Sequence, residues 1–554
     1  MLIALFNFTW ITISSYLIGK LIEKYVVKEK LPFDLLVIIG IVVLTVYAQT
    51  FSLFGGVKVG ANLILFLFCL CIGIVCCINK VFFNEIRKYI KTNKKKVILY
   101  CIFGLLFCAV SCHTPMIYDS SLYHAQAIRW IEEYGAVPGL GNLHNRLAYD
   151  SSFMCLQALF SWNFLTGKSL HCLNAFWAWI MFIYVTDTFR FLKDKNYFAS
   201  DILNISIVIY TIYALDGLSS PNTDYIAMTM VLYIFSRWLR SNRKIEKVVL
   251  VLFAIWTITI KLSAVAMGFL VFYPVVQGFK KRRYKELLYF TLVVICITLP
   301  FFARNVIISG YLLYPYPQID FFNVDWKMPE YTVTFDSNEI MAWGRNLNDV
   351  FLYDYTLQQW FPIWFNALLL EDKVLVIINV CSLVCTPFVL YINKKSKRAE
   401  ENKLLILSLV CLATWFLTAP LIRYGYAFIF LNLSIILGRL YQKYEIKLLK
   451  RMIVLSAVAL IMLKAYRTTE VLKPIELIYP MSYKEFPCYE VEMQDEVIYV
   501  PVYGDRTGYE KFPSTPYLQH LQKTELRGSD LKEGFKIKEE YVNTNLSTYG
   551  YIVE

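Results

Sequence analysis

Ionisable and aromatic side chains concentrate in one stretch of the chain, from His113 to Lys168, which lies between two apolar runs. Its charged and histidine side chains include Asp119, His124, Glu132, Glu133, His144, Arg146 and Asp150. No other stretch before residue 300 has this density of groups that can transfer protons or bind ions. The stretch is therefore typical of an active-site loop beside a membrane.

Asp119 comes just after the apolar run 97–113. A partly desolvated carboxylate at this boundary can act as general base on an acceptor hydroxyl, or help to hold Mg²⁺ or Mn²⁺ beside a phosphate. It can equally cap the interfacial helix that the spacing of apolar residues predicts over 121–134. In a helical segment His124 would approach Asp119, although an interfacial histidine that forms an ordinary hydrogen bond remains the alternative.

Three isolated cations stand at the ends of apolar runs: Lys261, Arg304 and Arg423, the last followed by Tyr424. Together they predict a site for a lipid phosphate, because guanidinium and ammonium groups bind phosphate oxygens. Each could instead extend its charge to the headgroup region, as single basic residues near a membrane do. Asp224 opens another apolar run, where an acid is either functional or stabilises the helix dipole.

The composition identifies the class of protein that must position these groups. Of the 554 residues, 57% are hydrophobic and 18% are charged, and the mean hydropathy is +0.49, which predicts a multi-spanning membrane protein. The net charge of +13 comes from short basic clusters between apolar runs, so nucleic-acid binding is not expected. The 14 cysteines lie mostly inside apolar runs, where they are expected to pack as small apolar residues.

Apolar runs predict about 12–14 transmembrane helices. The candidates are residues 1–19, 32–54, 60–79, 97–113, 169–188, 200–216, 224–239, 248–260, 263–278, 286–303, 373–392, 403–419, 424–438 and 452–466. The basic clusters all fall on the same side of this alternation, which predicts that this side is cytoplasmic. The loops 114–168 and 304–372 and residues 467–554 are then exoplasmic.

The predicted fold is an all-α polytopic membrane domain over 1–466, followed by a small exoplasmic α/β domain over 467–554. The second domain is predicted because apolar runs shorten after residue 467, while the segment 496–503 has the β-branched and aromatic content of a strand.

Four short motifs occur in order on the predicted exoplasmic side: YDSSLYH, PNTD, RNVIISGYLLYPYP and PLIRYG. Their order resembles that in GT-C membrane glycosyltransferases of the glycosyltransferase-39 type, which take sugars from polyprenyl-phosphate carriers. The whole chain is also similar to an uncharacterised family of bacterial multi-spanning proteins. The resemblance implies a GT-C-like fold in the bacterial cytoplasmic membrane.

By this resemblance, Asp119 takes the place of the catalytic or metal-binding acid, and Arg423 that of a carrier-phosphate ligand. Many GT-C enzymes have two consecutive acids in the first motif, whereas Ser120 follows Asp119 here. A second acid would have to come from Asp150 or Asp224, so a divalent cation remains an open expectation.

The expected function is inverting transfer of a sugar from a polyprenyl-phosphate donor to an exoplasmic glycan, lipid or protein, in contact with membrane lipid. Asp119 would be the catalytic base. The residues expected to bind substrate are His124, Asp150, Asp224, Lys261, Arg304, Arg423 and Tyr424. The alternatives are a polysaccharide polymerase or ligase acting on lipid-linked oligosaccharide, and a transporter.

Overall fold

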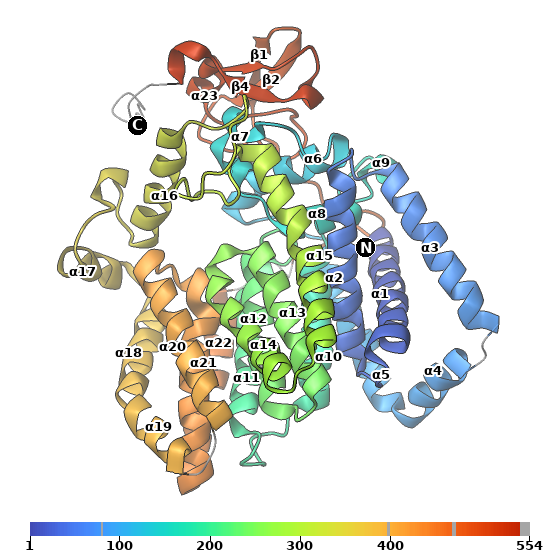
Figure 1. Cartoon of the computed structure of the whole chain (residues 1–554), viewed down its shortest axis with the longest axis vertical. Coiled ribbons are helices and arrows are strands. Elements are labelled where there is room, and N and C mark those ends of the chain that lie inside the picture. The colour runs from blue at the N-terminus through green and yellow to red at the C-terminus, as the bar shows by residue number, and fades with distance from the viewer. Residues whose placement is uncertain (79–80, 396–398, 468–472, 543–554) are drawn as a thin grey trace.

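The computed structural model describes residues 1–78, 81–395, 399–467 and 473–542, which are mostly helical (Figure 1). Seven helical segments within these ranges are long and apolar enough to cross a membrane, and a bent pair makes an eighth candidate. They are α1 (Leu2–Ile22) with its extension to Val27, α2 (Phe33–Ser52), α3 (Val59–Ile78), the segment from Leu262 through α14 (Phe272–Lys280), α15 (Tyr284–Ser309), α20 (Ala399–Thr418), α21 (Ile422–Tyr444), and the pair α18 (Leu370–Val384) and α19 (Thr386–Lys395).

The number of full-length apolar helices is therefore smaller than the 12–14 predicted from the sequence. Five predicted spans form helices of only 16 or 17 residues: α5 (Lys94–Val110), α10 (Leu173–Thr188), α11 (Phe198–Tyr213), α12 (Asp224–Arg240) and α13 (Lys244–Ile260). At 1.5 Å per residue such a helix measures about 25 Å, less than the roughly 30 Å of a hydrocarbon core. A sixth, α22 (Lys447–Arg467), is long but rich in basic residues. The architecture remains that of a multi-pass helical membrane protein.

Close backbone contact holds the first two helices together. A Cβ atom added to Gly40 of α2 would lie 1.9 Å from the carbonyl oxygen of Ser15 in α1. One added to Gly19 of α1 would lie 2.1 Å from the carbonyl oxygen of Leu36 in α2. Small residues permit this approach, on which helix packing in membranes depends.

Helix α12 runs through the centre of the bundle, and its side chains from Tyr225 to Trp238 are buried. It packs against α11, α13 and α21. Since the short turn after Arg240 reverses the chain, the start of α12 and the end of α13 lie at the same end of the bundle. The start of α21 lies there too, because Arg423 contacts Asp224.

The C-terminal residues form two small antiparallel sheets at one end of the bundle (Figure 1). Strands β1 (Cys488–Met493) and β2 (Glu496–Pro501) pair from Cys488 with Pro501 to Met493 with Glu496, and β3 (Thr524–Leu526) pairs with β4 (Phe535–Ile537). The strand predicted at 496–503 is confirmed as β2. The α/β character predicted for residues 467–554 is found over the described part.

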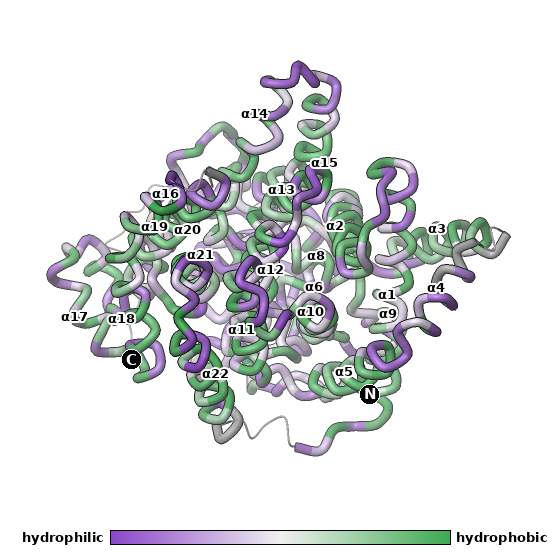
Figure 2. Tube along the Cα trace, turned by 90° about the horizontal axis from the view of Figure 1, so that it is seen from below, coloured by the Kyte–Doolittle hydropathy of each residue, from purple (hydrophilic) through white to green (hydrophobic). Residues whose placement is uncertain are grey.

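Shorter helices complete the structure: α4 (Val81–Thr92), α6 (Ala125–Glu133), α7 (Leu140–Leu143), α8 (Ser152–Leu159), α9 (Asn163–Thr166), α16 (Glu330–Gly344), α17 (Leu357–Ala367) and α23 (Leu518–Lys523). Helices α6 and α7 lie beside the strands, whereas α4 and α19 lie at the opposite end (Figure 1). Seen from that opposite end, hydrophilic turns and α4 stand out against hydrophobic helices (Figure 2). The two ends of the bundle thus carry different polar segments.

Candidate functional site

Five of the residues singled out in the sequence meet at the strand-bearing end of the bundle. The Nη2 atom of Arg423 lies 3.2 Å from Oδ2 of Asp119, and its Nε atom lies 3.7 Å from Oδ2 of Asp224. The ammonium group of Lys261 forms an ion pair with Asp224. The ring of Tyr424 lies 4.1 Å from Nζ of Lys261, and its hydroxyl accepts a hydrogen bond of 3.1 Å from Arg423. We call these five residues the charged cluster.

Four separate segments deliver the charged cluster. Asp119 precedes a short π-helical turn, Ser120–His124, that leads into α6. Asp224 is the first residue of α12, where a carboxylate is favoured by the helix dipole. Lys261 lies in extended conformation directly after α13, and Arg423 lies in the first turn of α21. Helix ends therefore place all the charges at one level of the bundle.

The side chains of the charged cluster differ in exposure. The side chain of Arg423 is 45% exposed and that of Asp119 is 23% exposed, whereas that of Asp224 is 15% exposed. Two carboxylates face two cations, so the site as it stands is balanced in charge. The exposure of Arg423 leaves its remaining N–H donors available to an anion from outside.

His124 joins the cluster from the buried side. Its side chain is only 3% exposed, and its Nδ1 atom has no hydrogen-bond partner among the described residues. Burial lowers the pKa of His124 to about 4, and the nearby cations Lys261 and Arg423 act in the same direction against the opposite effect of the acids. The imidazole is therefore neutral near pH 7.

Arg304 and Asp150 do not join the charged cluster. They form a separate buried ion pair, with Nε of Arg304 located 3.0 Å from Oδ1 of Asp150. Arg304 also donates a hydrogen bond of 2.6 Å to the hydroxyl of Ser52, and both members of the pair are about 2% exposed. The pair links α15 and α2 to the 114–168 loop, so the structure places these two residues in a packing role rather than beside the predicted phosphate site.

A further polar network was missed in the sequence. Arg146 forms ion pairs of 3.1 Å with Asp336 and 2.7 Å with Glu339, both from α16. Asp336 is fully buried and also accepts hydrogen bonds from the hydroxyls of Tyr149 and Tyr314. The signal available was the spacing of the two acids, which places them on one face of a helix. The network fastens the loop 304–372 onto the loop 114–168.

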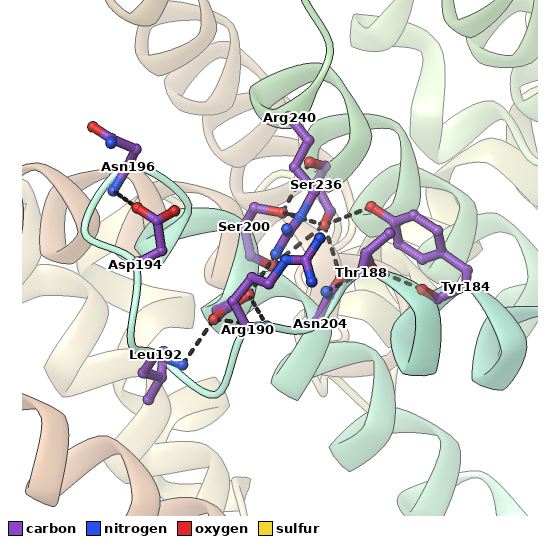
Figure 3. Close-up of polar contacts among 11 residues, drawn as sticks. Tyr184, Thr188, Arg190, Leu192, Asp194, Asn196, Ser200, Asn204, Ser236 and Arg240 are labelled. Atoms are coloured by element: carbon purple, nitrogen blue, oxygen red, sulfur yellow. Dashed lines mark hydrogen bonds and ion pairs between the residues drawn. The ribbon is translucent and has the colours of Figure 1, made fainter. Parts of the chain in front are cut away.

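Another buried network lies at the opposite end of the bundle. Asp201 of α11 accepts hydrogen bonds from the backbone N–H groups of Arg190 and Leu192, at 3.1 and 2.8 Å. The guanidinium of Arg240 contacts both Asp201 and Ser200. Figure 3 shows the side chain of Arg240 extending toward Ser200 and the loop that carries Arg190. Because each charge has a partner, this network stabilises the turn between α10 and α11.

The residues of the charged cluster do not match a divalent-cation site. Within the described ranges, no three His, Cys, Asp or Glu side chains gather closely enough to hold a metal ion. The two acids that are present, Asp119 and Asp224, are paired with Arg423 and Lys261, and these cations would repel a divalent ion. The cation expected from the resemblance therefore has no place in the function proposed below.

Comparisons with known proteins place the chain in a family without assigning an activity. No curated protein and no solved structure matches the chain. A family model described as "Domain of unknown function (DUF8201)" matches residues 1–430, which include every residue of the charged cluster. The chain therefore belongs to the DUF8201 family.

Proposed function

We propose that this protein is a membrane glycosyltransferase that moves a sugar from a polyprenyl-phosphate carrier to a hydroxyl group of a glycan, lipid or protein acceptor. The observation that supports the proposal is the convergence of Asp119, Asp224, Lys261 and Arg423 at one end of a helical membrane bundle. A base and a phosphate-binding cation in contact are the two groups that such a transfer needs.

In the proposed reaction, the acceptor hydroxyl oxygen forms a bond to the anomeric carbon of the sugar. The bond from that carbon to the phosphate oxygen breaks, and the polyprenyl phosphate leaves with the bonding electrons. Asp119 takes the proton of the hydroxyl, a role in which a positioned base contributes about 10²- to 10⁴-fold to the rate. Arg423 stabilises the negative charge that grows on the departing phosphate.

The contact between Arg423 and Asp119 supports a link between carrier binding and the position of the base. The guanidinium lies 3.2 Å from the carboxylate. A phosphate bound to the exposed side of Arg423 competes for the same donors, since guanidinium groups bind phosphate in two-pronged geometry. The carboxylate of Asp119 would then be released to face the acceptor hydroxyl when the donor is in place.

Lys261, Asp224 and Tyr424 hold Arg423 in position. Asp224 lies between the two cations, 3.7 Å from Nε of Arg423 and in contact with Lys261. The Tyr424 ring packs against both, at 4.1 Å from Lys261 and 5.0 Å from the guanidinium of Arg423. The proposal includes a bacterial cytoplasmic membrane location, with the cluster on the exoplasmic side and open to lipid carriers.

The test is mass spectrometry of the lipids that co-purify with the full chain in mild detergent. We expect the wild-type protein to retain a polyprenyl phosphate and the Arg423→Ala variant to lose it. Arg283→Ala is the matched control, because Arg283 is 53% exposed and pairs only with Glu286 at the surface among the contacts of described residues. Bulk phospholipid alone in all three samples would contradict the carrier class.

A further inference from the structure

A loop of the C-terminal part is fastened beside the proposed base. This tail loop comprises residues 504–511, with the sequence GDRTGYEK. The backbone N–H groups of Thr507 and Gly508 donate to the carbonyl oxygen of Ser121, at 3.1 and 2.9 Å. The hydroxyl of Tyr118 donates to Asp505. The tail loop therefore contacts the chain on both sides of Asp119.

Additional hydrogen bonds keep the tail loop in this position. The side-chain amide of Gln126 donates to the carbonyl oxygens of Gly508 and Lys511, at 2.9 and 2.8 Å. Arg129 donates to the carbonyl oxygen of Tyr509 at 2.7 Å. Gly508 has a φ of +74°, a conformation that glycine adopts without steric cost. The loop is thus held by the active-site segment rather than lying loosely over it.

The tail loop carries a cation, Arg506, beside the segment that contains Asp119. Its guanidinium lies between two aromatic rings, 4.7 Å from the centre of Tyr118 and 5.0 Å from that of Phe486. Within the described part of the chain, no ion pair joins it to a carboxylate, and the neighbouring Asp505 accepts a hydrogen bond from Tyr118. Aromatic faces fix the plane of a guanidinium but leave its N–H donors free.

A second cation lies on the same aromatic ring. The ammonium group of Lys484 is 5.7 Å from the centre of Phe486 and is exposed. No ion pair joins it to any carboxylate among the described residues. Lys484 and Arg506 thus share Phe486 as a support, next to the segment that carries Asp119.

We infer that Arg506 and Lys484 bind an acidic group of the substrate, a phosphate ester or a carboxylate, at a point away from the reacting hydroxyl. Two cations without carboxylate partners, held by rings beside the base, favour an anionic ligand. This site would make acidic molecules the substrates of the proposed function. The assignment as a substrate site rests on that function, whereas binding of an anion can be measured without turnover. The acidic group could belong to the acceptor or to the lipid carrier.

The experiment measures binding of three probes to the full chain in lipid nanodiscs. Calorimetric titrations at low ionic strength use inorganic phosphate and glucuronate, and lipid mass spectrometry follows undecaprenyl phosphate. We expect Arg506→Gln and Lys484→Gln each to raise the Kd of a soluble probe about tenfold, the loss of one charge-assisted hydrogen bond. Arg506→Lys keeps the charge and should keep most of the affinity. Lys532→Gln removes a charge from an exposed side chain elsewhere in the C-terminal part and should change nothing.

The three probes also distinguish the source of the acidic group. Weaker binding of a soluble probe with unchanged retention of undecaprenyl phosphate assigns the site to the acceptor. Loss of undecaprenyl phosphate in Arg506→Gln assigns it to the carrier. Unchanged binding of all three probes in both Gln variants would overturn the inference, while the Arg423→Ala comparison would still test the proposed function separately.

Discussion

The guanidinium of Arg423 lies 3.2 Å from the carboxylate of Asp119, and both side chains reach solvent, with 45% and 23% of their surfaces exposed. Arg423 lies in the first turn of α21 and Asp119 precedes the turn that leads into α6, so only the folded bundle brings them into contact. A solvent-exposed ion pair contributes little to the free energy of unfolding, so stability alone does not account for this contact. Its accessibility and its position beside the partly buried Asp224–Lys261 pair are the reason for assigning it a role in binding and proton transfer.

Replacing Asp119 by Asn should reduce transfer from a polyprenyl-phosphate sugar by about 10²- to 10⁴-fold, because the amide cannot accept the acceptor proton. Product formation in proteoliposomes provides the measurement. Retention of polyprenyl phosphate should persist, since Arg423 is unchanged. Asp495→Asn, in the exposed turn between β1 and β2, is the control. Turnover near the wild-type rate in Asp119→Asn would refute the assignment of the base.

Variants of the Lys261–Asp224 pair should show whether the pair contributes to stability, to lipid binding, or to both. Among the described residues, Lys261→Met leaves the carboxylate of Asp224 with the 3.7 Å contact to Arg423 as its one cation contact. The change should cost about 1–3 kcal/mol of stability, because the pair is partly buried. Adding Asp224→Asn removes the stranded charge and should restore most of that stability. Thermal unfolding measures the stability, and lipid retention reports on Arg423.

The double variant decides between two roles of the pair. If Asp224 and Lys261 position Arg423, retention of polyprenyl phosphate should stay low after the stability has recovered. Recovery of both properties together would show that the pair only stabilises the bundle.

Glu132 contacts Tyr509 of the tail loop, and its contribution to the free energy of unfolding should depend on pH. Burial raises the pKa of Glu132 from its ordinary value of 4.5 to about 7, and neighbouring hydroxyl groups, including that of Tyr509, oppose this only in part. The folded state therefore binds more protons than the unfolded state between these values. The contribution of Glu132 to stability should fall by about 3 kcal/mol as the pH rises through this range.

The measurement is the difference in free energy of unfolding between wild type and Glu132→Gln from pH 4.5 to 7. Subtraction is needed because burial lowers the pKa of His171 to about 3 and that of His124 to about 4, and these histidines favour the fold as the pH rises toward 6.5. The free energy of unfolding of the variant should increase relative to that of the wild type as the pH increases. A difference that is constant over this range would contradict the prediction.

Gly425, which lies two residues after Arg423, should not tolerate a side chain. A Cβ atom there would lie 2.1 Å from the indole ring of Trp415 in α20. Gly425→Ala should cost about 1–3 kcal/mol through overpacking and should move the first turn of α21. The temperature of thermal unfolding and the amount of polyprenyl phosphate that is retained should therefore both decrease.

Gly268→Ala provides the matched control, because its Cβ atom would meet only the end of the Ile258 side chain at 3.4 Å. Equal behaviour of the two variants would show that α20 and α21 have room to separate.

Much of the charged cluster was predictable from the sequence. Asp119, Asp224, Lys261 and Arg423 stand out as charges at the ends of apolar runs, and a charge in that position is either paired or functional. Alternation of apolar runs with basic clusters placed them at one end of the bundle before their contacts were known. That inference needs only the length of a helix and the cost of burying a charge.

The identity of the partners needed the tertiary structure. Arg304 has the same local pattern as Arg423, yet it is buried against Asp150, whereas Arg423 is exposed beside Asp119. Among the described residues, seven of the predicted spans, or eight with the bent pair, form helices that are long and apolar enough to cross a membrane. Others, such as α12, form shorter helices that are enclosed by other helices.

The individual contacts of the tail loop were decided only in three dimensions, although the sequence predicts that the C-terminal domain packs over the loops of that side. Its hydrogen bonds to Ser121 and Gln126 join segments that are distant in sequence, and most of them involve backbone atoms that every residue type carries. The sequence by itself therefore determined the class of protein and the groups able to do chemistry, because apolar runs and isolated charges are local properties. The tertiary structure decided which of these groups meet, because ion pairs and backbone contacts depend on how distant segments pack.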